Sequence, residues 1–500
     1  MDNSQPKGIK ALIAKMKSNK DGFKLTKEER NWALYDAGNS AIYMFLILVS
    51  VSIADLAYGT SGTNPTQLMS WFNAGTGIIV ALLGPIMGAI ADNRGRKKPL
   101  FKFFVYMGLF GCYSSLLANF SAFATNDAGF AWGFFVPFAI SLCFMYVGLG
   151  GSLLFYDSML GDVTTEERSD RVSSYGFAYG YIFSLIPFCV CLAIYYFFMD
   201  PQWSYENISF IKTLEQGYIA LRLAITICLA ISATWWYFMT RPLLKNYVQI
   251  SGVDPVKHQV RDAFKKLAKT FGELKHYKHA FLFMLAFFCY INGVNTVIAL
   301  SATYASDILT SPGVMENVYI LGEQLTPSTT NNLSVMLVVA LMMTQVIACI
   351  FSILFGKLSK NIGARNLIMI SVIGYLVFVV YAVFMGKTGL PPLADFFILA
   401  AGVGVFQGGI QALSRSYFCK LIPSEKQSEF FGLYDIFNKS SNFLGSLLFA
   451  AITLGLEQNQ GMHHVQANRI AVACLSVFFV VGLAILFFIP KNHADEVVSV

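Results

Sequence analysis

Charged side chains are scarce in this chain of 500 residues: they make up 13% of the sequence, whereas soluble globular proteins carry about 25%. Hydrophobic residues account for 55% and aromatic residues for 15% of the chain. A soluble fold of this size needs more charge on its surface than the chain supplies. We therefore expect lipid to be its main solvent.

Signatures of several other protein classes are missing as well. There is no Gly-x4-Gly-Lys-Ser/Thr phosphate-binding loop, which argues against ATP as a direct energy source. The pairs His276/His279 and His463/His464 lack the further ligands that a metal site requires, so we expect neither a metal nor a cofactor. An intramembrane enzyme would need a dense catalytic cluster at membrane depth, and a receptor or scaffold would need long soluble tails. Neither is present, so we expect no enzymatic activity.

What the chain has instead is twelve apolar runs of about 20 residues, long enough to cross a bilayer core of ~30 Å. They predict an all-α integral membrane protein, with twelve transmembrane helices in two pseudo-symmetric six-helix bundles. The runs lie near 39–58, 68–91, 100–119, 131–156, 172–198, 217–239, 280–304, 333–356, 367–386, 394–418, 431–455 and 469–489.

The basic residues predict the orientation of these helices. If the N-terminus is cytoplasmic, 31 of the 36 Lys and Arg residues fall in cytoplasmic segments, and only Lys212 and Lys387 fall in outer loops. This bias is typical of multi-pass membrane proteins and places both termini inside. The net charge of +7 therefore reflects membrane orientation and does not indicate nucleic-acid binding. The predicted parts are a basic tail (1–38), a first bundle (39–240), a linker (241–279), a second bundle (280–490) and a short tail (491–500).

Two glycine-punctuated loops indicate that the bundles are related. The first loop is Gly88–Lys98, and a degenerate copy, Gly356–Arg365, lies 268 residues later, with the second glycine seven residues after the first in both. Similar loops at similar places in two halves are the plan of many transporters. We expect Gly88 and Gly95 to allow a tight turn and Asp92 to accept hydrogen bonds from a neighbouring helix N-terminus. With Arg94 and Arg96 they would form a gate; the plainer interpretation is a simple basic loop.

The first loop resembles the signature Gly-x3-Asp-(Arg/Lys)-x-Gly-Arg-(Arg/Lys) of the major facilitator superfamily, from which Asn93 departs. Further stretches resemble the vacuole effluxer family, which comprises fungal autophagy-related vacuolar amino-acid exporters and their bacterial relatives. They are Trp32–Asp36 with Gly38–Ala41, Gly408–Ser416, and Glu429–Asp435 with Lys439. This resemblance implies solute movement, with amino-acid export as one such activity.

The eleventh run carries the clearest polar stripe. Asp435, Asn438, Lys439 and Asn442 recur at helical spacing on one face. Lys439 lies ~13 Å beyond Phe430 along the helix, near the bilayer middle, where ionisable side chains usually face a cavity. We expect the stripe to line a solute cavity; the alternative is an ion pair that only holds helices together. Further polar residues at membrane depth either line that cavity or bridge helices: Asn292, Asn295, Gln407 and Gln411.

Other ionisable residues are candidates for gating or coupling. Asp36 and Asp55 lie 19 residues apart, ~29 Å along one helix, so Asp36 with Asn39 would join an inner gate and Asp55 an outer vestibule. Asp157 and Arg415 fall at equivalent places in the two halves and would help to close the inner gate. Asp36, Asp55 and Asp435 are candidates for proton coupling. For each, the alternative is an ordinary interfacial charge.

The sequence thus predicts a secondary active transporter of a small polar solute that works by alternating access. Amino-acid export is one activity; the alternatives are a transporter-like receptor or scaffold, or a proton-coupled exporter of drugs or other metabolites. Its partners would be the solute, a coupling proton or cation, and the lipid bilayer, with no nucleic acid. We expect a monomer, in the plasma membrane of a bacterium or the vacuolar membrane of a fungus.

Overall fold

The computed structural model describes residues 23–61, 75–76, 79, 83–84, 86–122, 128–199, 217–252, 277–320, 322–326 and 330–489. The chain divides into two compact units. Unit 1 comprises Met1–Arg168, Tyr179–Leu267 and Ser424–Leu433, and unit 2 comprises Ser169–Ala178, Ala268–Pro423 and Tyr434–Val500. Each unit therefore includes a ten-residue segment from the other half of the sequence.

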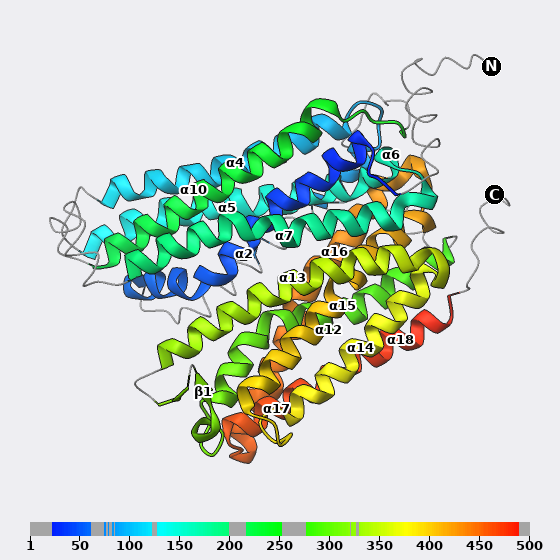
Figure 1. Ribbon diagram of the computed structural model, residues 1–500. Coiled ribbons are helices and arrows are strands. Elements are labelled where there is room, and N and C mark those ends of the chain that lie inside the picture. The colour runs from blue at the N-terminus through cyan, green and yellow to red at the C-terminus, as the bar shows by residue number, and fades with distance from the viewer. Residues whose placement is uncertain are drawn as a thin grey trace, which may run out of the picture. The chain divides into compact units, whose positions relative to one another are not determined.

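The helices of unit 1 are long and apolar. They are α2 (Lys27–Ser61), α4 (Lys97–Ala122), α5 (Ala128–Ser158), the short α6 (Leu160–Val163), most of α7 (Glu166–Met199) and α10 (Gly217–Asn246). Helix α4 lies beside both α5 and α10 (Figure 1). A Cβ atom on Gly148 of α5 would overlap the backbone of Gly108 on α4, so this pair packs through small residues, as membrane helices commonly do.

Unit 2 repeats this all-helical plan. Its helices are α12 (Lys278–Leu309), α13 (Thr330–Ile362), α14 (Ala364–Phe384), α15 (Pro392–Leu421), most of α16 (Gln427–Gln460), α17 (His464–Cys474) and α18 (Ser476–Phe487). Helix α15 packs against α13 and α14, and α12 packs against α18 (Figure 1). Two short 3-10 helices, Met315–Asn317 and Ser424–Lys426, and a small hairpin of β1 (Tyr319–Ile320) and β2 (Glu323–Gln324) complete the described elements.

Nine of the helices that the structure describes contain a segment long and apolar enough to cross a membrane. They correspond to the predicted third to tenth and twelfth runs. The first and eleventh predicted runs lie within α2 and α16, and the second lies mostly outside the described residues. The fold is the all-helical membrane fold that the sequence predicts, and the number twelve stays a prediction.

Local sequence signals set several boundaries. Helix α2 begins before its apolar stretch, because Thr26 and Glu29 form a capping box: Thr26 N donates to Glu29 Oε2 over 2.8 Å and Glu29 N donates to Thr26 Oγ1 over 3.2 Å. Gly95 and Gly363, the second glycines of the two related loops, both adopt the left-handed region, with φ of 76° and 86°. Glycine is the residue that enters this region without strain, so both loops have a glycine with positive φ at the equivalent position.

Candidate functional site

The loop of unit 1 carries a buried carboxylate that caps a helix. Asp92 is 5% exposed. Its Oδ1 accepts a hydrogen bond from Ser428 N (2.8 Å) and its Oδ2 accepts one from Glu429 N (2.9 Å). Both donors lie in the first turn of α16, where backbone N–H groups lack intrahelical partners and the helix dipole favours an anion. The structure confirms that Asp92 accepts hydrogen bonds from a neighbouring helix N-terminus.

Burial raises the pKa of the Asp92 carboxyl to about 6. The nearby Lys97 charge and the hydrogen bonds from Ser428 and Glu429 oppose this rise but do not cancel it. Desolvation destabilises a charged carboxylate, and the donors recover part of that cost. The protonation of the Asp92 carboxylate therefore depends on whether that side chain stays buried.

The backbone at Gly88 approaches α16 so closely that a side chain has no room. A Cβ at this position would overlap the carbonyl oxygen of Ser428 and would lie 3.2 Å from Glu429 Cα. The obstacle is backbone, which cannot rotate away as a side chain can. Glycine at position 88 is thus required by this close approach, in addition to the turn at Gly95.

Beside Asp92 lies a fully buried ion pair. Lys97 Nζ, at the start of α4, lies 2.9 Å from Asp162 Oδ2 on α6, and the two side chains are 1% and 0% exposed. The lysine also donates to Ser158 O over 3.2 Å. A buried pair is tolerated when hydrogen bonds satisfy its remaining polar atoms, and the carboxylate side of this pair meets that condition.

The additional donors to Asp162 come from the residues just after α10. Ser251 N (2.9 Å) and Ser251 Oγ (2.7 Å) donate to Asp162 Oδ1, and the Tyr247 hydroxyl donates to Oδ2. Burial alone would raise the pKa of the Asp162 carboxyl. Its pKa nevertheless lies below the usual value, because the Lys97 charge and the hydrogen bonds from Ser251 and Tyr247 stabilise the ionised form.

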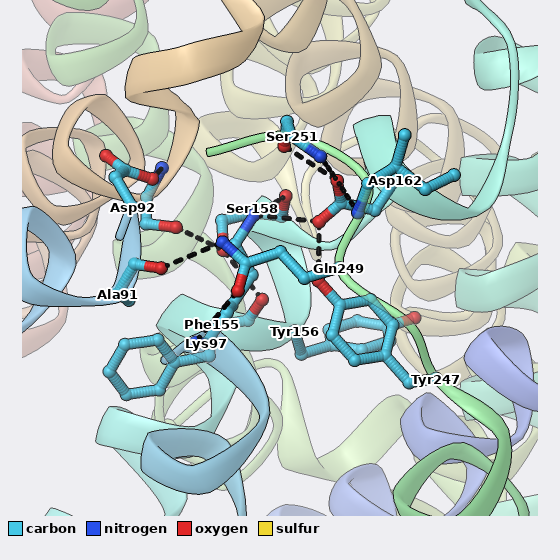
Figure 2. Close-up of polar contacts among 12 residues, drawn as sticks. Ala91, Asp92, Lys97, Phe155, Tyr156, Ser158, Asp162, Tyr247, Gln249 and Ser251 are labelled. Carbon is cyan, nitrogen blue, oxygen red and sulfur yellow. Dashed lines mark hydrogen bonds and ion pairs between the residues drawn. The ribbon is translucent and has the colours of Figure 1, made fainter. Parts of the chain in front are cut away.

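Gln249 joins the same residues to the loop itself. Its Nε2 donates to Ala91 O (3.1 Å) and Asn93 O (3.3 Å), and its Oε1 accepts a hydrogen bond from Lys97 N (3.2 Å). Figure 2 shows Gln249 between the loop that bears Asp92 and the pair of Lys97 and Asp162. One amide side chain thus contacts the backbone on both sides of Asp92 and at the start of α4.

A second polar cluster fixes the start of α2. Glu29 is buried and accepts two hydrogen bonds from Arg168, at 2.8 and 2.7 Å, and one from Thr164 Oγ1 at 2.7 Å. Nearby, Tyr156 donates to Asp36 Oδ2 over 2.7 Å and stacks on Trp32 with ring centroids 4.4 Å apart. Asp36 is therefore covered within unit 1.

Among the other predicted gating residues, Asn39 is buried, Asp157 is half-buried, and Arg94 and Arg96 are exposed. Arg94 Nε donates to Gly252 O over 3.2 Å, which ties the loop to the residues after α10.

In unit 2, Arg415 is buried and bound to the start of α7. Its Nε donates to Ser173 Oγ (3.0 Å), its Nη2 donates to Ser173 O (3.1 Å), and its guanidinium lies 4.4 Å from the centre of the Phe177 ring. Lys420 pairs with Asp170 at 2.7 Å. These contacts place Arg415 in a polar cluster of unit 2, whereas its pairing with Asp157 stays a prediction.

The predicted cavity residues are distributed over α12, α15 and α16 of unit 2. Asn292, Gln407 and Asp435 are buried, and Asn295, Gln411 and Asn438 are half-buried. Asn292 Nδ2 donates to Phe288 O over 2.6 Å within its own helix. The side chains of Asp55, Lys439 and Asn442 lie outside the described part of the structure.

The loop of unit 2 has a glycine with positive φ at the equivalent position but different chemistry. Lys360 occupies the position equivalent to Asp92, and Arg365 the position equivalent to Lys97. Arg365 donates to Leu486 O, at 3.0 and 2.7 Å, so it binds the C-terminal end of α18. Carbonyl groups at a helix C-terminus attract cations. Helix capping by a carboxylate at this position is therefore a property of the loop in unit 1.

Sequence reasoning missed Asp162, Tyr247, Gln249 and Ser251. Asp162 lies between two apolar runs, and the other three lie at the start of the linker. No motif joins these positions. Their one visible signal is that uncharged polar residues follow α10 in a linker that is otherwise strongly basic.

Comparison with known proteins identifies the family of the chain. The family model described as "Vacuole effluxer Atg22 like" matches residues 157–497. The chain is 34% identical to the MFS-type transporter YxiO of Bacillus subtilis over 487 residues, covering 95% of this chain and 97% of that protein. It is 26% identical to autophagy-related protein 22-2 of Aspergillus clavatus over 304 residues, which is 57% of this chain and 43% of the longer fungal protein.

Solved structures agree on the fold. The proton:xylose symporter XylE aligns with a TM-score of 0.58 at 13% identity, covering 93% of this chain and 95% of that one. The transporter FucP, described in the outward conformation, aligns with a TM-score of 0.62 at 12% identity, covering 93% and 100%. At such low identity the likeness concerns the fold alone, which is that of the major facilitator superfamily.

Fold and relatives together define a multi-pass membrane transporter of the major facilitator type, not an enzyme. Within that class, the chain belongs to the Atg22-like vacuole effluxer family.

Proposed function

We propose that this protein exports a small polar solute, with amino acids as the first class to test, by secondary active transport. The observation that carries the proposal is the match of the effluxer family model to residues 157–497, which include the whole of α10 and every helix of unit 2. The direction of transport follows the description of the family, and the solute class follows the family resemblance of the motifs around Asp36, Arg415 and Asp435.

We further propose that Asp92 and the first turn of α16 act as a latch in an alternating-access cycle. The two hydrogen bonds to Ser428 and Glu429, together with the close approach at Gly88, support a contact that forms and breaks as a unit. The exposed charges of Arg94 and Arg96 would face anionic headgroups on the cytoplasmic side, with both termini on that side. Arg415 with Ser173, and Asp36 with Tyr156, are proposed to hold the neighbouring helix ends.

The solute cavity is assigned to the polar face of unit 2. Asp435, Asn438, Lys439 and Asn442 on α16, Asn292 and Asn295 on α12, and Gln407 and Gln411 on α15 supply both charges and both hydrogen-bonding types that a zwitterion requires. Asp36, Asp55 and Asp435 are the acids proposed for proton coupling.

The test is efflux from proteoliposomes that contain the purified protein. Labelled amino acids are loaded as a panel, and flux is measured with and without an imposed pH gradient. We expect protein-dependent efflux of at least one amino acid, and a dependence on the gradient if protons drive it. Absence of flux for every amino acid would reject the assigned solute class, and a second panel of other polar metabolites would then be tested.

A further inference from the structure

The residues that follow α10 are bound to the loop as a continuous strap, which we define as Tyr247–Gly252. Its contacts lie within unit 1. Lys98 Nζ donates to Tyr247 O over 3.1 Å, and Arg94 Nε donates to Gly252 O over 3.2 Å. The two ends of the strap are therefore tied to the loop that bears Asp92.

The middle of the strap is anchored independently by Asp162. Ile250 N, Ser251 N and Ser251 Oγ all donate to Asp162 Oδ1, at 3.2, 2.9 and 2.7 Å. Asp162 in turn is held by the buried Lys97. An ionised, buried acceptor with this many donors forms strong hydrogen bonds. The backbone that directly follows Gln249 is thereby fixed.

From this fixed position the Gln249 side chain forms hydrogen bonds with the backbone next to Asp92 and with the backbone at the start of α4. Its Nε2 contacts the carbonyls of Ala91 and Asn93, which flank Asp92 directly, and its Oε1 contacts the N–H of Lys97, where α4 begins (Figure 2). Because the residues before and after Asp92 are both held by one amide, the direction in which the Asp92 carboxyl points is set by Gln249. The three contacts involve backbone atoms, so both carboxylate oxygens of Asp92 accept hydrogen bonds from α16.

We propose that the linker strap is a working part of the latch, with Gln249 as the positioning residue that aims the Asp92 carboxylate at Ser428 and Glu429. This inference rests on the latch role of Asp92. It assigns to the start of the linker a function beyond joining the halves: displacement of the strap, by any cause, weakens the latch without a change in Asp92 or α16.

The experiment is hydrogen–deuterium exchange on the purified full-length protein, read at the backbone amides of Ser428 and Glu429. These amides donate to Asp92, so their exchange reports the latch and not the strap. Gln249→Met keeps the length of the side chain and removes its hydrogen bonds. We expect exchange at the two amides to accelerate by roughly tenfold, from the loss of hydrogen bonds that hold the loop. Asn246→Ala is the matched control, because this exposed side chain donates to Pro242 O within its own helix.

A double variant separates a positioning role from general loosening. In the Asp92→Asn background the carboxylate is absent, so Gln249→Met should add no further acceleration at Ser428 and Glu429. An additive effect would reject positioning through Asp92. If Asp92→Asn accelerates exchange and Gln249→Met does not, the role of the strap is rejected and the latch survives. If Asp92→Asn itself has no effect, the proposed latch fails. The efflux measurement on the same proteins tests the solute class separately.

Discussion

Lys97 and Asp162 form an ion pair of 2.9 Å in which both side chains are almost fully buried. Such a pair stabilises a fold less than its short distance suggests, because both charges have lost their water. Its main consequence is that neither partner can be removed alone. The strap and the loop both depend on this pair, so its integrity decides whether the site assembles.

We therefore expect Lys97→Met to destabilise the protein by about 3 kcal/mol, the lower part of the range for breaking a buried pair, since Ser251 and Tyr247 still donate to Asp162. Thermal unfolding of the purified protein provides the measurement. Lys102→Met on the same helix is the control, because Lys102 is exposed. Equal melting temperatures for the two variants would show that the pair does not contribute as described.

Gly88→Ala should weaken the contact between the loop and α16. The added methyl group meets the backbone carbonyl of Ser428, and overpacking of this kind costs about 1–3 kcal/mol. We expect faster amide exchange at Ser428 and Glu429 and reduced transport. Gly455→Ala on α16 is the comparison: a Cβ atom at this position would have no neighbour within 4 Å among the described residues, so it should leave both readouts unchanged. Normal exchange in Gly88→Ala would contradict the close approach.

The latch should depend on pH through Asp92. Its pKa is about 6 when buried, against an ordinary value of 3.8. A carboxyl whose pKa is raised by burial favours the buried state fully below its ordinary pKa, and that advantage is lost as the pH rises through the raised value. Protection of the Ser428 and Glu429 amides, corrected for intrinsic exchange, should therefore fall between about pH 4 and pH 6.

Asp92→Asn has no titratable carboxyl at this position, so protection of the Ser428 and Glu429 amides in this variant should be flat over the same range of pH. A slope in the variant equal to that of the unmodified protein would assign the pH dependence to another group.

Lys439→Ala should abolish transport while leaving expression and membrane insertion intact. The reason is positional: a charge ~13 Å into the helix costs at least about 2.5 kcal/mol unless it faces a polar cavity, so its removal should not harm folding. Efflux from proteoliposomes with matched protein content measures the effect. Lys387→Ala, in a predicted outer loop, is the control. Unchanged efflux in Lys439→Ala would remove this lysine from the solute path.

Much of the fold could be predicted from the sequence, because its determinants are local. Apolar runs predict membrane helices, and Thr26 with Glu29 predicts the start of α2 through a contact only three residues long. The role of Asp92 as a hydrogen-bond acceptor could also be predicted from the sequence, since the loop pattern suggests a carboxylate near a helix end. In each of these cases the relevant chemistry is contained in a short stretch of residues.

The sequence did not predict which distant residues these side chains contact. Lys97 and Asp162 are 65 residues apart, and Gln249 is 152 residues from Lys97. An amide at the start of a linker has no pattern that predicts which carbonyls it will meet. Asp162 is one of five acids between two membrane runs, and nothing in the sequence distinguishes it from an ordinary surface charge, although the structure shows it buried.

The assignment of Ser424–Leu433 to unit 1 and of Ser169–Ala178 to unit 2 has a consequence for biogenesis. Proteins are synthesised from the N-terminus, and domains generally fold as units while the chain emerges. Unit 1 cannot be completed in that way, because its final segment is translated after α12, α13, α14 and α15 of unit 2. Two gene fragments divided at the linker would likewise each encode a unit that lacks ten of its residues. The capping of Asp92 is thus one of the last steps of maturation, and a ribosome that stalls before codon 428 leaves a nascent chain in which that carboxyl is still uncovered.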